Sequence, residues 1–213
     1  MRLIATATTK MKHSFSRQHL AAARLFAQLA TEIEARGEAE ETTKKEHRAY
    51  VTGAVVFSVA FLEASINELY LEAVDGNKTS LPSLTDPQFT ILTELWPIVE
   101  QQQILGKYQT VLAACGLHRF DKGAEPFQGV DNLVKIRNVL IHYRPEWDDE
   151  LVEHKKIQDR LSDKFELNPL AGPGTLWFPH QCLGSGCSRW AVEQVGQFMT
   201  EFCQRLEIPS RLP

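Results

Sequence analysis

Three side chains suited to phosphate chemistry lie within six residues of one another, namely Arg137, Asn138 and His142. The imidazole of His142 titrates near neutrality, so it can take up and release a proton under physiological conditions. The guanidinium of Arg137 is permanently charged, and its planar fork of donors fits phosphate oxygens. A lone histidine near a helix end more often supplies a charge to the helix C-terminus than acts as a catalyst. The neighbouring Arg137 and Asn138 favour the chemical interpretation.

The segment that positions these residues is predicted to be a helix from Phe127 to Tyr143. Pro145 ends it, because the residue before a proline is disfavoured in the helical region. On a helical wheel, one broad apolar arc holds Val130, Leu133, Val134, Ile136, Leu140 and Ile141. The opposite arc holds Asp131, Lys135, Asn138 and His142. Arg137 falls inside the apolar arc, where it needs a partner because an unpaired buried charge is costly.

A long helix predicted from Glu40 to Val74 carries the complementary feature. Its exposed strip is expected to hold Ser65, Glu68 and Glu72. Glu63 falls among the apolar residues on the opposite side, with Asn67 one turn further on. We therefore predict that Glu63 pairs with Arg137 across a contact between the two helices. A buried pair of this kind often does no more than fix the register of two helices, and this alternative stays open for Glu63.

The segment from Arg137 to His142 reads Arg-Asn-Val-Leu-Ile-His, which matches the signature of HEPN domains: arginine, a polar residue, three further residues and histidine. The segment 61–69, Phe-Leu-Glu-Ala-Ser-Ile-Asn-Glu-Leu, resembles the second-helix segment common in that family. Together with a chain that reads as helical almost throughout, these motifs indicate that residues Arg17 to Lys164 resemble a HEPN domain.

The resemblance implies a small helical bundle that dimerises, with the motifs of both protomers lining a cleft at the dimer interface. Many HEPN domains are metal-independent ribonucleases that act as toxins or in defence against phage. By this resemblance, His142 is the general base or acid at the ribose 2′-hydroxyl and the leaving oxygen. Arg137 stabilises the charge on the phosphorane, and Asn138 orients His142 or holds a phosphate oxygen. Because Arg137 and His142 point about 140° apart on an ideal helix, Arg137 must extend around the helix or a second protomer must supply one of them.

Four further residues are expected to support this site: Glu63, Asn67, Tyr143 and Arg144. Some HEPN toxins carry a tyrosine two residues after the histidine, which a partner nucleotidyltransferase modifies. That position is Arg144 here, and the tyrosine is Tyr143, which argues against regulation by that route. Other members of the family have lost catalysis and serve as interaction modules.

Length and composition describe an ordinary globular protein. The 213 residues are 43% hydrophobic and carry 23 basic against 27 acidic side chains, a net charge of -4. This charge argues against a protein that coats nucleic acid non-specifically, because such affinity comes from neutralising phosphates. It is compatible with a few cations, such as Arg137, Arg144 and Lys135, gathered at one cleft.

The remaining patterns complete an all-α prediction. Helices are also expected over 17–36, 88–96, 98–115, 149–164 and 188–206, with an interruption at Pro97. We predict an up-and-down helical bundle of HEPN type over residues 1–166. Residues 167–213 are expected to form a Pro- and Gly-rich arm and a final helix that pack on the same domain. Trp177, Phe178 and Trp190 are expected to anchor the arm.

Two other groups of residues have side chains that could bind a metal ion or an anion. His180, Cys182, Cys187 and Cys203 suggest zinc, but their spacing fits no standard ligand pattern, so buried structural cysteines are favoured and no metal or cofactor is expected. A basic rim near the cleft consists of Lys107, Arg119, Lys122, Lys135 and Arg144. Scattered, solvated surface charge is the slightly favoured alternative for this group.

The sequence thus predicts a metal-independent endoribonuclease that cleaves RNA by attack of the 2′-hydroxyl on the phosphodiester, as a toxin or anti-phage effector. The alternatives are a non-catalytic RNA- or protein-binding module and a helical scaffold. Expected partners are RNA, a second copy of the chain, and an antitoxin or regulatory protein. The longest apolar run, Ala54 to Leu62, is too short to span a bilayer, so we expect no membrane. The lack of a secretory signal pattern and reduced cysteines favour the cytoplasm.

Overall fold

The computed structural model describes residues 12–37, 40–147 and 149–213, and these residues form helices and no strand. The all-α prediction is therefore confirmed. The elements are α1 (Ser16–Arg36), α2 (Glu41–Val74), α3 (Asp86–Val99), α4 (Ile104–Ala114), α5 (Phe127–Ile141), α6 (Glu153–Leu161), the short π-helical turn η1 (Trp177–Gln181) and α7 (Ser185–Leu206).

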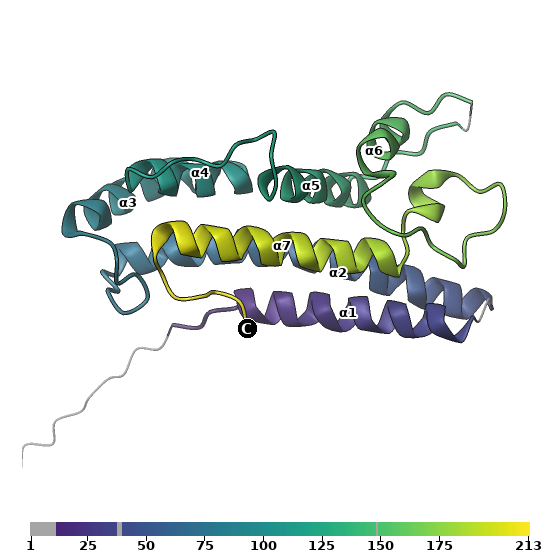
Figure 1. Ribbon diagram of the computed structural model, residues 1–213, viewed down its shortest axis with the longest axis horizontal. Coiled ribbons are helices and arrows are strands. Elements are labelled where there is room, and N and C mark those ends of the chain that lie inside the picture. Colours follow the sequence, from purple (N-terminus) through teal and green to yellow (C-terminus); the bar gives the residue numbers. More distant parts are fainter. Residues whose placement is uncertain (1–11, 38–39, 148) are drawn as a thin grey trace, which may run out of the picture.

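The long helices lie side by side, and the shorter ones cover them (Figure 1). α1, α2 and α7 pack on one another, while α3, α4 and α5 follow end to end along the other side of the bundle. α6 and η1 contact each other at the end of the bundle where α5 stops. α7, the last helix in the chain, therefore belongs to the same core as α1 and α2.

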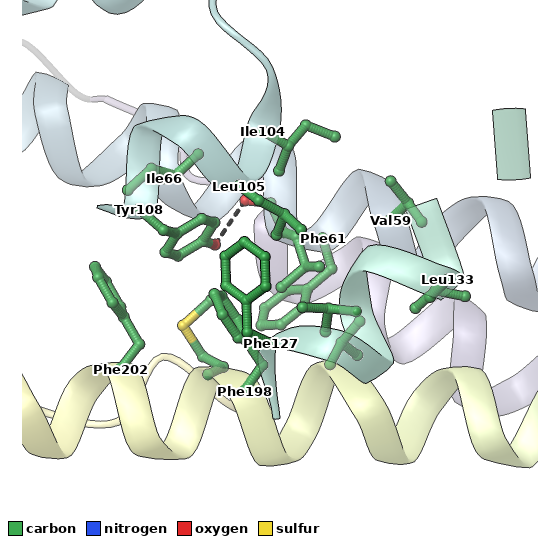
Figure 2. Packing of buried hydrophobic residues seen from close by; sticks show 14 of the residues in the cluster. Val59, Phe61, Ile66, Ile104, Leu105, Tyr108, Phe127, Leu133, Phe198 and Phe202 are labelled. Carbon is green, nitrogen blue, oxygen red and sulfur yellow. Dashed lines mark hydrogen bonds between the residues drawn. The ribbon is translucent and has the colours of Figure 1, made fainter. Parts of the chain in front are cut away.

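Aromatic residues hold α5 in place from the core (Figure 2). The rings of Phe198 and Phe202 on α7 meet the edge of Tyr108 on α4 at centroid separations of 4.9 and 4.7 Å. The buried Tyr108 hydroxyl donates a 2.7 Å hydrogen bond to the Leu62 carbonyl of α2, so its burial leaves no donor unpaired. Phe127, the first residue of α5, packs against Phe198 at 6.4 Å. These contacts fix the start of the helix that carries the motif.

α5 is shorter than predicted, because it ends at Ile141 instead of Tyr143. His142 is the residue after the helix, with φ −106° and ψ 39°, and its N–H donates to the Asn138 carbonyl at 2.9 Å. No helix continues from Tyr143 to Trp147, which agrees with the restriction that Pro145 places on its predecessor. The wheel that placed His142 opposite Arg137 therefore does not apply to His142.

α6 is also shorter than the predicted 149–164. The carboxylate of Glu146 accepts hydrogen bonds from the backbone N–H groups of Val152, Glu153 and His154, at 2.9 to 3.1 Å. An acid that accepts these free N–H groups fixes the first turn of a helix. This carboxylate, not the composition of the helix, sets where α6 begins.

The predicted interruption at Pro97 is wrong, because α3 continues through Pro97 to Val99. A proline near the C-terminus of a helix removes one backbone hydrogen bond, and the Glu100 N–H still closes the last turn on the Trp96 carbonyl at 2.9 Å. Accordingly α4 begins at Ile104 and not at Ile98, which is 69% exposed in α3.

α7 begins at Ser185, three residues earlier than predicted. The N–H and hydroxyl of Ser185 donate to the carboxylate of Glu34, at the end of α1, at 2.6 and 2.5 Å. One free backbone N–H at the start of α7, together with the Ser185 hydroxyl, is thus satisfied by a residue distant in sequence, which no local pattern could indicate.

By length and composition alone, α2 is apolar enough to cross a bilayer, with a mean hydropathy of 1.7 over 18 residues. This differs from the expectation based on uninterrupted apolar runs. Half of that window is buried inside the bundle, and central helices of soluble bundles show the same property.

Candidate functional site

A groove runs between α5, the start of α4 and the connection that joins the two helices. Its volume is about 630 Å³. We call it the α4–α5 groove, and it is lined by Gln102, Gln103, Ile104, Leu105, Gly106, Gln109, Thr110, Arg119, Phe120, Lys122, Phe127, Asp131, Val134, Lys135, Arg137 and Asn138.

The charge of the groove is strongly positive. Four lining side chains are basic and one is acidic, a balance of +4 and −1 that leaves +3. Asp131 forms an ion pair with Lys135 one turn along α5. Among the described residues, no carboxylate forms an ion pair with Arg119, Lys122 or Arg137. Unpaired cations that face one cavity form a binding site for an anion with several charges.

The structure brings three members of the expected basic rim together, because Arg119, Lys122 and Lys135 all line the groove. Arg144 is exposed and does not line it. Lys107 was expected on the rim but is buried, with 3% of its surface exposed. It lies on α4, which is covered on several sides, so its long side chain points into the bundle.

Two of the three motif residues reach the groove. Arg137 is half-buried, and its Nε is shielded from solvent without a hydrogen-bond partner among the described residues. Asn138 is exposed and also lines the groove. Arg137 and Asn138 therefore line the same cavity, and their roles toward a phosphate stay a prediction.

His142 does not line the groove. It is exposed at the end of α5, and exposed apolar side chains surround it in sequence. The exposed fractions are 50% for Ile141, 46% for Tyr143 and 78% for Trp147. Single exposed apolar residues are normal on a protein surface, whereas a contiguous patch of them marks an interaction site. We call Ile141, Tyr143 and Trp147 the apolar rim of His142. Within one chain, the structure does not bring His142 and Arg137 to one cavity.

The predicted ion pair between Glu63 and Arg137 does not form within one chain. Glu63 was expected to be buried, but it is exposed. Ser65 was expected to be exposed, but it is buried. The wheel of α2 failed because α1, α3, α4, α5 and α7 all pack against this helix, so it has no single apolar arc.

Asn67 binds Lys107, a contact that the sequence did not reveal. The Asn67 side-chain oxygen accepts a hydrogen bond from Lys107 Nζ at 2.9 Å, and the ammonium lies 5.6 Å from the ring centre of Trp96. Burial lowers the pKa of Lys107, and the nearby carboxylates of Glu63 and Glu100 partly oppose this. Asn67 therefore stabilises a buried charge and lies outside the groove.

Tyr143 packs in an aromatic stack, whereas the next residue, Arg144, is exposed. Its ring lies 5.4 Å from the buried ring of His154 and 6.3 Å from Phe178 of η1. Phe178 was expected to anchor the arm, and it lies on His154 at 4.9 Å.

The cysteines lie apart from this site. Cys182, Cys187 and Cys203 are buried, and burial raises the pKa of the Cys187 thiol to about 12. No group of three or more His, Cys, Asp or Glu side chains that suits a metal ion is found in residues 12–37, 40–147 and 149–213.

Sequence reasoning missed the neutral polar wall of the groove. Gln102 and Gln103 lie in the turn before α4, and Thr110 lies on α4 itself. The run of glutamines at 101–103 was the available signal, but it fell inside the helix predicted over 98–115, and only the fold shows that Gln102 and Gln103 line a groove beside α5. A comparison of the chain with family models, curated proteins and solved structures found no match.

Proposed function

We propose that this protein is a metal-independent endoribonuclease of HEPN type that binds the RNA backbone in the α4–α5 groove. The observation that carries the proposal is the set of unpaired cations, Arg119, Lys122 and Arg137, that line one groove together with Asn138. A backbone of phosphates is the anion that such a row of cations fits, and the glutamines of the groove supply donors to sugars and bases.

Cleavage requires His142, which lies outside its own groove. In a two-fold dimer each motif meets its copy, so the His142 of one protomer would act on the phosphate held by the groove of the other. Burying the apolar rim of His142 at that contact would also remove Trp147 from water. His142 would then take the proton of the 2′-hydroxyl, or return one to the leaving oxygen, while Arg137 stabilises the developing charge.

A second candidate function follows from the same geometry. Because His142 is outside the groove of its own chain, a protein that remains monomeric would bind RNA without cutting it. The groove is equally suited to that role, since holding phosphates needs only its cations.

The test compares the wild type with His142→Ala for cleavage of RNA in EDTA. We expect wild-type cleavage and at least a 100-fold loss in the variant, the scale of general acid–base catalysis. His13→Ala, which changes an exposed histidine outside the motif and the groove, is the matched control. Equal cleavage by wild type and His142→Ala refutes the nuclease, whereas RNA binding without cleavage by either supports the second candidate.

Growth arrest on expression, abolished by His142→Ala, would place the activity in a toxin or defence effector. An antitoxin or regulatory protein and a cytoplasmic location belong to the same proposal.

A further inference from the structure

A second cavity lies between the start of α2 and the segment 168–183, which is the part of the arm that precedes α7. Its volume is about 270 Å³. We call it the arm pocket. It is lined by Glu41, Lys44, His47, Arg48, Asn168, Leu170, Ala171, Gly172, Thr175, Pro179, His180 and Leu183, and it shares no residue with the α4–α5 groove.

The polar side of the arm pocket is basic. Lys44, His47 and Arg48 are spaced three and four residues apart, which places them on one face of α2. His180 reaches the pocket from η1. Among the described residues, no carboxylate forms an ion pair with Lys44, Arg48 or His180. Glu41 is the one acidic residue in the lining.

His47 is fixed in the wall of the arm pocket. It is 2% exposed, and its Nε2 lies 2.7 Å from the carboxylate of Glu34, which also holds Ser185. Burial raises the pKa of Glu34, but hydrogen bonds from His47 and Ser185 outweigh this, and the pKa lies below its ordinary value. Glu34 is therefore ionised and fully engaged. The carboxylate thus holds the His47 ring in one orientation in the wall of the pocket.

The opposite wall is apolar and held in shape by hydrogen bonds. Leu170, Pro179 and Leu183 contribute apolar surface. The Asn168 side chain bridges the arm, because its amide donates to the His180 carbonyl at 3.2 Å and its oxygen accepts the Leu170 N–H at 2.9 Å. The pocket is thus preformed, as small-molecule sites usually are.

We propose that the arm pocket binds a small phosphorylated ligand of the size of a mononucleotide. Arginine, lysine and histidine from two elements converge as they do around phosphate groups, and the apolar wall fits a planar or sugar moiety. A volume of about 270 Å³ lies just below the usual range for ligand sites, so the pocket fits a ligand no larger than a single nucleotide.

The test is titration calorimetry of the full chain with AMP, inorganic phosphate and adenosine. We expect AMP to bind, adenosine to bind at least tenfold more weakly, and the double variant Lys44→Gln/Arg48→Gln to lose at least tenfold in AMP affinity. Lys45→Gln, which changes an exposed lysine beside the pocket, is the matched control and should change the affinity by less than twofold.

Arg119→Gln separates this site from the α4–α5 groove, because AMP binding that depends on Arg119 and not on Lys44 belongs to the groove. AMP binding that depends on Arg119 and not on Lys44 would overturn the proposal. So would each of three other results: adenosine binding as tightly as AMP, phosphate binding as tightly as AMP, or AMP not binding at all. The outcome is independent of whether the protein cleaves RNA.

Discussion

The salt dependence of RNA binding tests the α4–α5 groove most directly. Each phosphate that a protein cation neutralises on single-stranded RNA changes the slope of log K against log salt concentration by about −0.7. The three unpaired cations of the groove, Arg119, Lys122 and Arg137, therefore predict a slope of about −2. Lys135 is already paired with Asp131 and adds little.

From this slope, raising the salt from about 50 to 200 mM should weaken binding roughly 20-fold. Arg119→Gln removes one of the three cations, so the slope should become shallower by about 0.7. Fluorescence polarisation of a labelled single-stranded RNA, with His142→Ala as the background to prevent cleavage, measures both quantities. Arg36→Gln, an exposed arginine at the end of α1, is the matched control.

Two results would refute the reasoning. If the Arg119→Gln slope equals that of the background protein, the phosphates do not lie in the groove. If Arg36→Gln lowers the slope as much as Arg119→Gln does, the binding is spread over the surface. The first result would give the groove cations a role other than binding RNA, and the second would make the groove no more important for RNA binding than the rest of the surface.

Three further predictions concern the bundle and its contacts. Glu34→Gln removes the carboxylate that holds His47 and the start of α7, so the free energy of unfolding at pH 7 should fall by about 2 kcal/mol in urea titrations. Folding lowers the pKa of Glu34, so this carboxylate stabilises the wild type fully above its unfolded pKa. That stabilisation is lost as the pH falls through the folded pKa. The Glu34→Gln variant should not show this loss of stability at low pH. Gly129→Ala places a methyl group against the Gln194 side chain of α7, which should cost about 1–3 kcal/mol, and the added change Gln194→Ala should recover part of this in a double-mutant cycle. Trp147→Ser should weaken dimerisation in sedimentation experiments while circular dichroism stays unchanged, since 78% of the side chain is exposed in one chain.

The ends of helices that depend on one or two residues could be predicted from the sequence. Gly37 ends α1 with a positive φ of 67°, as a C-terminal glycine does, and the turn at 75–77 ends α2. Pro126 and Pro145 bound the segment that contains α5. In each case the stop depends on the conformation of one or two residues, which the sequence states directly.

Features that depend on contacts between residues far apart in the chain could not be predicted from the sequence. The start of α7 depends on Glu34, which is 151 residues away in the chain. The exposure of Glu63 and the burial of Lys107 depend on how many helices surround α2 and α4. The groove depends on the segment that carries Arg119 and Lys122, which has no periodic pattern and takes its place only by packing beside α5.

The end of α5 at Ile141 changes what the motif can do in a single chain. Arg137 and Asn138 belong to the helix and face the groove, whereas His142 belongs to the segment that follows and lies beside exposed apolar residues. One part of the motif therefore faces the basic groove, and the other part lies on the exposed surface beyond the end of α5. In the dimer proposed above, a second copy would bury Trp147 and would bring an imidazole to a groove whose lining contains none. The oligomeric state should thus separate the two candidate functions, with the monomer binding RNA and the dimer cutting it.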